Sequence, residues 1–196
     1  MNLAIFDFDG TISFKDSFRG FIIYYHGYLS FILGSIILTP VYLSYWFRII
    51  SNNTMKERVI SYYFRDEMVV DFERKCSEYS THEIDKIIRT KAKDCIKWHQ
   101  TRGDRVIVVS ASVNSWLKIW CEEKKIELIA TELDIKDGRL SGKLKGRNCY
   151  GVEKVNRIKK EIELEIFEEV YSYGDSKGDR EILELATKGY FKPFRD

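Results

Sequence analysis

The fold of this 196-residue chain is decided close to its start, by the stretch Leu3-Ala-Ile-Phe-Asp7-Phe-Asp9-Gly-Thr11. The apolar run that opens this stretch predicts a strand buried on both faces, as the strands of parallel sheets are. Two acids and a glycine turn follow at once. Because ligands of open α/β sheets bind at the carboxyl ends of the strands, we expect Asp7 and Asp9 to lie in a functional site.

Downstream of this stretch, apolar runs alternate with segments of helical periodicity, which is typical of an α/β fold. We expect strands over residues 105–109, 126–131 and 169–173, and helices over residues 84–100, 152–163 and 179–187, with a further helix ending near residue 124. Asp137-Gly138 between apolar residues predicts a hairpin. The pattern therefore predicts a Rossmann-like parallel sheet core with right-handed connections.

A long insert separates the first strand from the rest of the predicted sheet. Residues 14–83 have helical spacing, apolar at first and then amphipathic and charged from Met55 to Tyr79. We therefore expect residues 1–13 and 84–196 to form the core, and residues 14–83 to form a helical cap inserted after the first strand. A helical unit beside the first acidic loop is suited to act as a lid.

The composition excludes several classes of protein. Lys and Arg number 32 against 30 Asp and Glu, and this balance argues against a nucleic-acid-binding protein. Hydrophobic residues make up 44% of the chain, enough for a core. The N-terminus has no basic region ahead of its apolar run, so we expect a cytoplasmic enzyme, either free or attached to the cytoplasmic face of a membrane. The scattered cysteines predict neither a zinc site nor disulfides: Cys76, Cys95, Cys121 and Cys149.

Polar residues fall where the predicted sheet would bring them together. Asp7 and Asp9 follow the first strand, Ser110 follows the second, and Asp175 and Asp179 follow a later one. Taken singly, each is ordinary, since acids cap helices and serines end strands. Together they suggest a specific chemistry, because clustered carboxylates need a cation and hard oxygen ligands suit Mg²⁺.

This inventory fits phosphoryl transfer. A carboxylate beside Mg²⁺ can attack phosphorus, and an acid two residues along can protonate the leaving oxygen. A hydroxyl such as Ser110 and an ammonium such as Lys154, near the start of a predicted helix, can hold the phosphoryl oxygens.

The order of these residues resembles that of the haloacid dehalogenase superfamily. Its first motif is similar to Asp7-Phe-Asp9-Gly-Thr11, its second to Val108-Val-Ser110, its third to Lys154 and its fourth to Gly174-Asp-Ser-Lys-Gly-Asp179. Haloacid dehalogenases proper lack the second acid of the first motif, so the resemblance implies a phosphatase.

The insert lies between the first and second motifs, and in this it resembles the helical cap of the phosphoserine-phosphatase-like subfamily, subfamily IB. Further segments resemble its phosphatidylglycerophosphatase C-like branch: Thr131-Glu-Leu, Cys149-Tyr-Gly-Val-Glu-Lys154 and Phe191-Lys-Pro193.

The resemblance implies a role for each motif residue. Asp7 would be the nucleophile and a Mg²⁺ ligand, and Asp9 would be the general acid and base, with its backbone carbonyl on the metal. Asp175 would bind Mg²⁺, and Asp179 would be an outer or weak ligand.

Phosphate binding would fall to Ser110, Ala111 and Lys154. Ala111-Ser112 stand where phosphoserine phosphatases usually have Gly-Gly after this serine. This departure concerns recognition of an amino-acid substrate more than it concerns the chemistry.

The most unusual segment runs from residue 20 to residue 47, where 28 residues include no Lys, Arg, Asp or Glu. One interpretation is an apolar cap core with a substrate pocket. Others are a homodimer interface, or a hairpin that enters one leaflet of a membrane and breaks near Pro40. Two full crossings would need roughly 40 apolar residues, which the segment lacks. Flanking cations could meet lipid phosphates or form a solvated boundary: Arg19, Arg48, Lys56 and Arg58.

The sequence thus predicts a Mg²⁺-dependent phosphatase that acts through an aspartyl-phosphate. The substrate is either a small soluble phosphomonoester or a lipid phosphate. A phosphomutase and a catalytically silent binding protein are the remaining alternatives, because core motifs do not tell what accepts the phosphoryl group.

Overall fold

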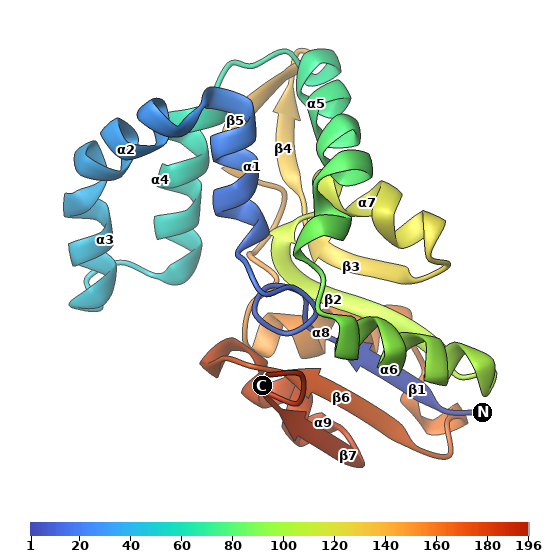
Figure 1. The fold of residues 1–196 in the computed structure, drawn as a ribbon. Coiled ribbons are helices and arrows are strands. Elements are labelled where there is room, and N and C mark those ends of the chain that lie inside the picture. Colours follow the sequence, from blue (N-terminus) through green and yellow to red (C-terminus); the bar gives the residue numbers. More distant parts are fainter. Residues whose placement is uncertain (196) are drawn as a thin grey trace.

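The computed structural model describes residues 1–195, and within them five parallel strands form one sheet in the order β3, β2, β1, β6 and β7 (Figure 1). In that order they cover Glu127–Thr131, Arg105–Val113, Leu3–Phe6, Val170–Gly174 and Lys188–Phe191. The strand β1 lies at the centre, with Phe6 paired to Val108 of β2 and to Tyr173 of β6. This register brings the ends of the central strands to one edge, and it confirms the predicted α/β fold.

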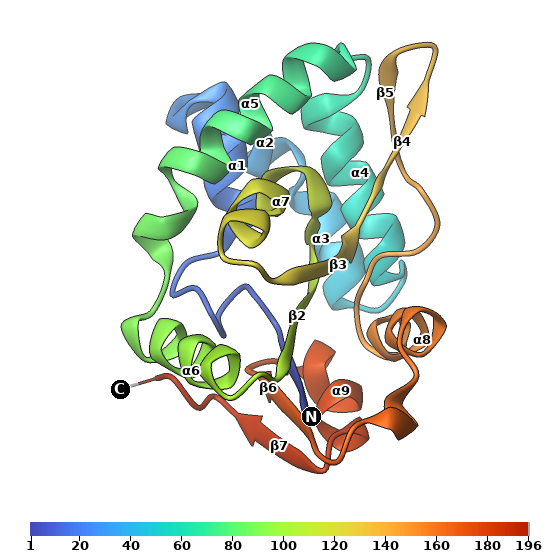
Figure 2. The same ribbon diagram turned by 90° about the vertical axis from the view of Figure 1, so that its right-hand side faces the viewer.

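Helices cover both faces of this sheet, and β1 shows why. Its side chains alternate, as in any strand. Ala4 and Phe6 pack in one hydrophobic cluster with α6 and α7, whereas Leu3 and Ile5 pack in another with α8 and α9. These helices cover Thr90–Thr101, Asn114–Glu123, Val152–Glu161 and Arg180–Leu185. Figure 2 shows α6 and the α8–α9 pair on opposite sides of the sheet.

The insert after β1 contains α1 to α5, which cover Ser17–His26, Tyr28–Ile37, Thr39–Trp46, Asn52–Phe64 and Val69–His82. A two-stranded hairpin of β4 (Leu133–Lys136) and β5 (Arg139–Leu144) stands beside α4 in both views (Figures 1 and 2). Its backbone is tied to the insert, since the amide of Asp66 donates to the carbonyl of Leu140 at 2.9 Å. The hairpin predicted at Asp137-Gly138 therefore packs with the cap helices.

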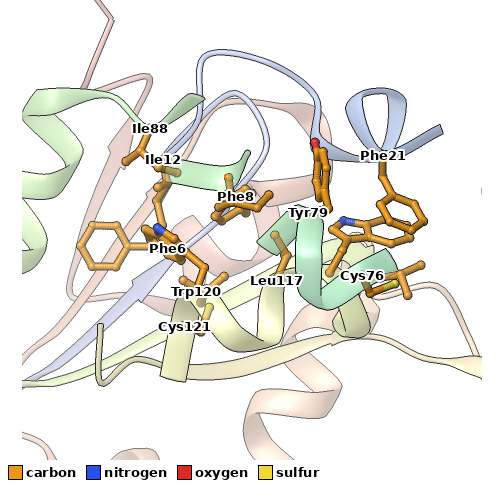
Figure 3. Close-up of a cluster of buried hydrophobic side chains, with 14 of the residues drawn as sticks. Phe6, Phe8, Ile12, Phe21, Cys76, Tyr79, Ile88, Leu117, Trp120 and Cys121 are labelled. Carbon is orange, nitrogen blue, oxygen red and sulfur yellow. The ribbon is translucent and has the colours of Figure 1, made fainter. Parts of the chain in front are cut away.

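Aromatic side chains join the cap to the sheet (Figure 3). Phe8, just after β1, lies edge-on to Trp120 of α7 with ring centroids 5.6 Å apart. Phe21 of α1 contacts Tyr79 of α5 at 5.3 Å and stacks on Trp116 at 4.7 Å. One continuous hydrophobic cluster therefore extends from the sheet into α1, α4 and α5.

Two cap helices lie at the border of this cluster, which they contact through Phe31, Leu38 and Val41. In Figure 1, α2 and α3 form a corner that points away from the sheet. No helix in residues 1–195 is long and apolar enough to cross a membrane alone, and α1 with α2, which reach that length together, are bent by 115°.

Several elements differ from the sequence-based expectations. The helix expected over residues 84–100 is divided into a 3₁₀ turn, Ile84–Ile87, and α6. The backbone between them is held by the loop after β1, because Phe14 donates to Ile87 and Arg89 donates to Ile12, both at 2.9 Å. The strand expected over 105–109 continues to Val113 through a register shift after Ser110.

The helix expected over residues 179–187 ends at Leu185, and the strand β7 follows it unpredicted. All four residues of β7 are exposed, so the segment has no buried apolar run that would predict a strand. This segment forms a strand because its backbone pairs with β6 at the edge of the sheet. Two further 3₁₀ turns cover Leu164–Ile166 and Lys177–Asp179.

Candidate active site

A buried lysine lies between two acids at the carboxyl edge of the sheet. The Nζ of Lys154 is 2.6 Å from Oδ1 of Asp7 and 2.7 Å from Oδ1 of Asp179. Asp7 directly follows β1, Lys154 lies in the first turn of α8, and Asp179 precedes α9. The structure thus joins three of the predicted site residues in one ion-paired group.

The ionisation of this group is set by burial. Burial raises the pKa of Asp7 to about 7, with a further contribution from Asp179 and against the influence of Lys154. For Lys154, burial alone lowers the pKa, but the two carboxylates outweigh it and the pKa is raised. The lysine therefore stays charged and keeps a cation beside Asp7.

Asp179 has little free capacity for a further ligand. Burial alone raises its pKa, but Lys154 and the hydrogen bonds at Ser176 outweigh burial and lower it. Its Oδ1 accepts from Lys154, and its Oδ2 accepts from the amides of Asp175 and Ser176 and from the Ser176 hydroxyl. These bonds shape the turn after β6 and orient the lysine.

Asp175 lies at the end of β6, close to the loop after β1. Its Oδ1 is 3.5 Å from the hydroxyl of Thr11, and its Oδ2 pairs with Arg195 near the C-terminus. Gly10 makes this approach possible, because its φ is +88° and a Cβ there would lie 2.6 Å from Oδ2 of Asp175. Burial, together with Asp179, raises the pKa of Asp175.

Asp7 and Asp175 fit a divalent cation, with Asp179 in an outer position because both of its oxygens already accept hydrogen bonds. Carboxylate oxygens of Asp7, Asp175 and Asp179 lie within 4.8 Å of one another. Hard oxygen donors on rigid strand ends are the set that Mg²⁺ prefers. A cation there would also offset the burial that raises the pKa of Asp7.

Asp9 lies apart from this group and is held by hydroxyls. Its Oδ1 accepts from the amide of Ser17 at 2.6 Å, and its Oδ2 accepts from the hydroxyls of Ser112 at 2.5 Å and Ser17 at 3.2 Å. Burial, and next the charge of Asp16, raises the pKa of Asp9 to about 6. Such a carboxyl group can hold or release a proton near neutral pH.

The sequence did not predict that Ser17 and Ser112 bind the carboxylate of Asp9. Ser17 follows the helix cap Asp16, so it reads as an ordinary first-turn residue. Ser112 gave one signal, since it stands two residues after the second-motif serine.

Ser110 and Ala111 lie at the irregularity of β2, beside the ion-paired group. Ser110 is buried, and its hydroxyl accepts from the amide of Ser112 at 3.0 Å. The carbonyl of Ala111 accepts from Thr131 at 2.9 Å and from the ammonium of Lys56. Ser110 and Ala111 thereby line the same cavity as Asp7 and Lys154.

A cavity of about 230 Å³ connects the predicted residues. Its lining includes Asp7, Asp9, Ser110, Ala111, Lys154 and Asp179. The cap contributes Asp16 and Phe18, at the start of α1, and Lys56 of α4. Asp175 lies beside the cavity, with its carboxylate toward Asp7 and Asp179.

Lys56 is a functional candidate that sequence reasoning misplaced. It was grouped with cations that meet lipid phosphates or solvent, but it is 7% exposed and lies in the cavity. Its ammonium is 5.1 Å from the centroid of Phe18, and burial lowers its pKa to about 8. The sequence around Lys56 does not predict its burial, because a lysine in a charged helical segment is buried only if its face of the helix packs against the core.

Comparison with known proteins places this site in a family. The family described as haloacid dehalogenase-like hydrolase matches residues 4–184. The chain belongs to the haloacid dehalogenase-like hydrolases. The predicted superfamily and the predicted class of hydrolase are thereby confirmed.

Among curated proteins, this haloacid dehalogenase-like hydrolase is similar to Protein CicA of Caulobacter vibrioides. The two are 28% identical over 195 residues, which cover 98% of this chain and 86% of that protein.

Among solved structures, a Bordetella pertussis Tohama I protein of unknown function has a TM-score of 0.79 at 22% identity, over 95% of this chain and 87% of the other. A phospho-aspartyl intermediate analogue of phosphoserine phosphatase has a TM-score of 0.60 at 19% identity, over 96% and 84%. These two likenesses concern the fold.

Proposed function

We propose that this hydrolase cleaves a phosphomonoester with the help of Mg²⁺, by way of a phosphorylated Asp7. The observation that carries the proposal is that Asp7 and Asp9 lie in different surroundings. Asp7 lies with Asp175, Asp179 and an ammonium in one group, whereas Asp9 is held separately by hydroxyls. A nucleophile beside cations and a second, independently held acid are the parts that two-step phosphoryl transfer needs.

In the first step, a carboxylate oxygen of Asp7 attacks phosphorus and the bond from phosphorus to the leaving oxygen breaks. Asp9, with its pKa raised to about 6, gives its proton to that oxygen. Lys154 and the hydroxyl of Ser110 hold phosphoryl oxygens, on which negative charge is spread in the transition state.

In the second step, water attacks the phosphorus of the aspartyl-phosphate. Asp9 takes a proton from this water, the bond from phosphorus to Asp7 breaks, and inorganic phosphate leaves. The hydroxyls of Ser17 and Ser112 keep Asp9 in place for both transfers.

Asp7, Asp175 and the backbone carbonyl of Asp9 would hold Mg²⁺, with Asp179 as an outer or weak ligand. The metal would supply a positive charge that reduces repulsion between Asp7 and the phosphate. Support for a phosphorylated aspartate comes from the fold shared with phosphoserine phosphatase, whose solved structure is described as a phospho-aspartyl intermediate analogue.

The first candidate substrate is a small soluble phosphomonoester that the cap selects. Lys56 and Asp16 bring a positive and a negative group into the cavity from the cap side. A lipid phosphate is the second candidate, because α2 and α3 expose many apolar side chains on the same cap.

The test measures phosphate release from soluble phosphomonoesters and from lipid phosphates, with Mg²⁺ and with a chelator. We expect Mg²⁺-dependent release that is lost in Asp7→Asn by a factor of at least about 10³. Asp94→Asn, on the exposed side of α6, is the matched control and should keep its activity.

Each result has a definite meaning. Release that persists in Asp7→Asn would exclude Asp7 as nucleophile. Transfer to a substrate hydroxyl without phosphate release would indicate a phosphomutase. Folded protein that turns over no substrate on the panel would contradict the proposal and favour a binding protein.

A further inference from the structure

The corner of the cap formed by α2 and α3 exposes an apolar surface that no part of the described chain covers. We call residues 28–47 the α2–α3 unit. Its exposed side chains include Leu29, Leu33, Ile36, Ile37, Leu43 and Trp46, which are between 51% and 82% exposed. Isolated apolar residues are common on protein surfaces, but a contiguous group marks an interaction site.

The composition of the unit differs from that of an ordinary surface helix. A surface helix carries polar residues opposite its apolar stripe. In α2 only Gly34 is buried, in α3 no residue is buried, and neither helix contains a charged side chain. The exposed side chains of the two helices are therefore mostly apolar, with Ser30 and Thr39 as polar exceptions.

Three hydroxyl groups of the unit donate to backbone carbonyls of the unit itself. Ser35 donates to the carbonyl of Phe31 at 2.8 Å, Thr39 donates to that of Ser35 at 3.0 Å, and Ser44 donates to that of Pro40 at 2.7 Å. Protein interfaces need about one hydrogen bond per 100–200 Å² across them. Hydroxyls turned back on their own backbone suit an apolar environment better than a protein partner.

Several backbone amides at the junction of the two helices are hydrogen-bonded or lack a hydrogen. Pro40 has no amide hydrogen at a helix start, where that donor would otherwise be free. The amides of Val41 and Tyr42 donate to the carbonyl of Leu38 at 2.9 and 3.1 Å. The bend between α2 and α3 can therefore lie in an apolar medium at low cost.

Cations flank the unit at both ends of the charge-free segment. The guanidinium of Arg19 lies 5.1 Å from the ring centroid of Phe31, and Arg48 is exposed two residues after the end of α3. Trp46, the last residue of α3, is 82% exposed. Exposed tryptophan and arginine side chains are suited to the headgroup region of a bilayer, and cations are attracted to anionic lipids.

We propose that the α2–α3 unit docks the cap into one leaflet of a membrane that contains anionic phospholipids. Helices of 10 and 8 residues are only about 15 and about 12 Å long, half of a hydrocarbon core of about 30 Å. The unit therefore enters the interface and does not cross it. The proposal does not depend on the hydrolase mechanism.

Docking would hold the cavity near the membrane. Tyr63 of α4 donates to the carbonyl of Phe31 in α2 at 3.2 Å, and α4 also carries Lys56. The docked helices are thus tied to the helix that lines the cavity.

The experiment is co-sedimentation of the full chain with vesicles of phosphatidylcholine, alone or mixed with phosphatidylglycerol. We expect binding that is stronger to the mixed vesicles, and at least about tenfold weaker binding for Ile36→Asp. Ile166→Asp is the matched control, because Ile166 is 59% exposed on the core and Ile36 is 64% exposed on the unit.

A second pair of variants tests the electrostatic part. Arg48→Glu should weaken binding to the mixed vesicles. Lys160→Glu makes the same charge change at an exposed position of α8 and should weaken binding less. Phosphate release from a soluble substrate, measured on the same variants, keeps a failure of docking distinct from a failure of the hydrolase proposal.

Three results would overturn the proposal. The first is a chain that stays in the supernatant with both kinds of vesicle. The second is an equal loss of binding for Ile36→Asp and Ile166→Asp. The third is a dimer in solution that Ile36→Asp converts to a monomer without any vesicle binding, which would assign the surface to a second copy.

Discussion

At the scale of single residues, Lys56 places a titratable cation within the cavity. Its amine donates to the Ala111 carbonyl beside Ser110, and burial lowers its pKa to about 8. Most lysines stay charged well above this pH. A phosphate dianion in the cavity would therefore meet a positive charge from the cap only below about pH 8.

From this we predict that kcat/KM falls as pH rises through about 8, because the free enzyme then loses the Lys56 proton. Lys56→Met should lower kcat/KM about tenfold at neutral pH and remove this alkaline decline. The measurement is a pH profile of kcat/KM with a soluble phosphomonoester.

Lys56→Arg provides the matched control. An arginine stays charged throughout this range, so activity should persist above the pH at which the lysine form declines. An unchanged profile in Lys56→Met would show that Lys56 does not contact the substrate.

At the scale of elements, the packing of α2 on α4 depends on one glycine. A Cβ on Gly34 would lie 2.6 Å from Cζ of Tyr63 and 2.7 Å from Cε1 of Tyr62. These rings belong to α4, so a side chain at this position would force the two helices apart.

Gly34→Val should therefore lower the free energy of unfolding by about 1–3 kcal/mol, as overpacking does. The measurement is urea-induced unfolding followed by circular dichroism. Leu33→Val is the control on the same helix: Leu33 is 52% exposed, and its replacement should change the free energy by less than about 0.5 kcal/mol. Equal effects of the two changes would contradict this contact.

At the scale of the whole molecule, a buried histidine links the helical layer to the sheet. His99 of α6 is 2.8 Å from Asp104, which precedes β2, and 2.9 Å from the hydroxyl of Tyr173 in β6. Burial lowers the pKa of His99 and outweighs the opposing influence of Asp104. The folded chain therefore holds this histidine neutral.

The sign of the resulting pH dependence follows from proton uptake. Below about pH 6.5 the unfolded chain binds a proton at His99 that the folded chain does not, so the free energy of unfolding falls. His99→Gln should destabilise the protein by about 1–2 kcal/mol at pH near 8, and this deficit should shrink as pH falls to about 5.5.

Urea unfolding of both proteins across this range measures the difference, in which contributions from the acids of the site cancel. His82→Gln, at an exposed histidine of α5, serves as the control. A deficit for His99→Gln that stays constant with pH would contradict a neutral, buried His99.

The sequence by itself predicted four strands of the sheet, β1, β2, β3 and β6, and the acids at its edge. A buried strand and the turn after it are local patterns, and parallel pairing then brings Asp7 and Asp175 together without further information. The edge strand β7 lacks this pattern, because all of its residues are exposed, and it was missed.

Only the tertiary structure decided which residues complete the site and which remain exposed on the surface. The hydroxyls of Ser17 and Ser112 meet at 2.8 Å although 95 residues separate them. The charge-free segment proved to be divided, with Phe21 buried in the core and Ile36 exposed. Hydropathy cannot separate these two, because the burial of a side chain depends on which neighbours the fold brings to it.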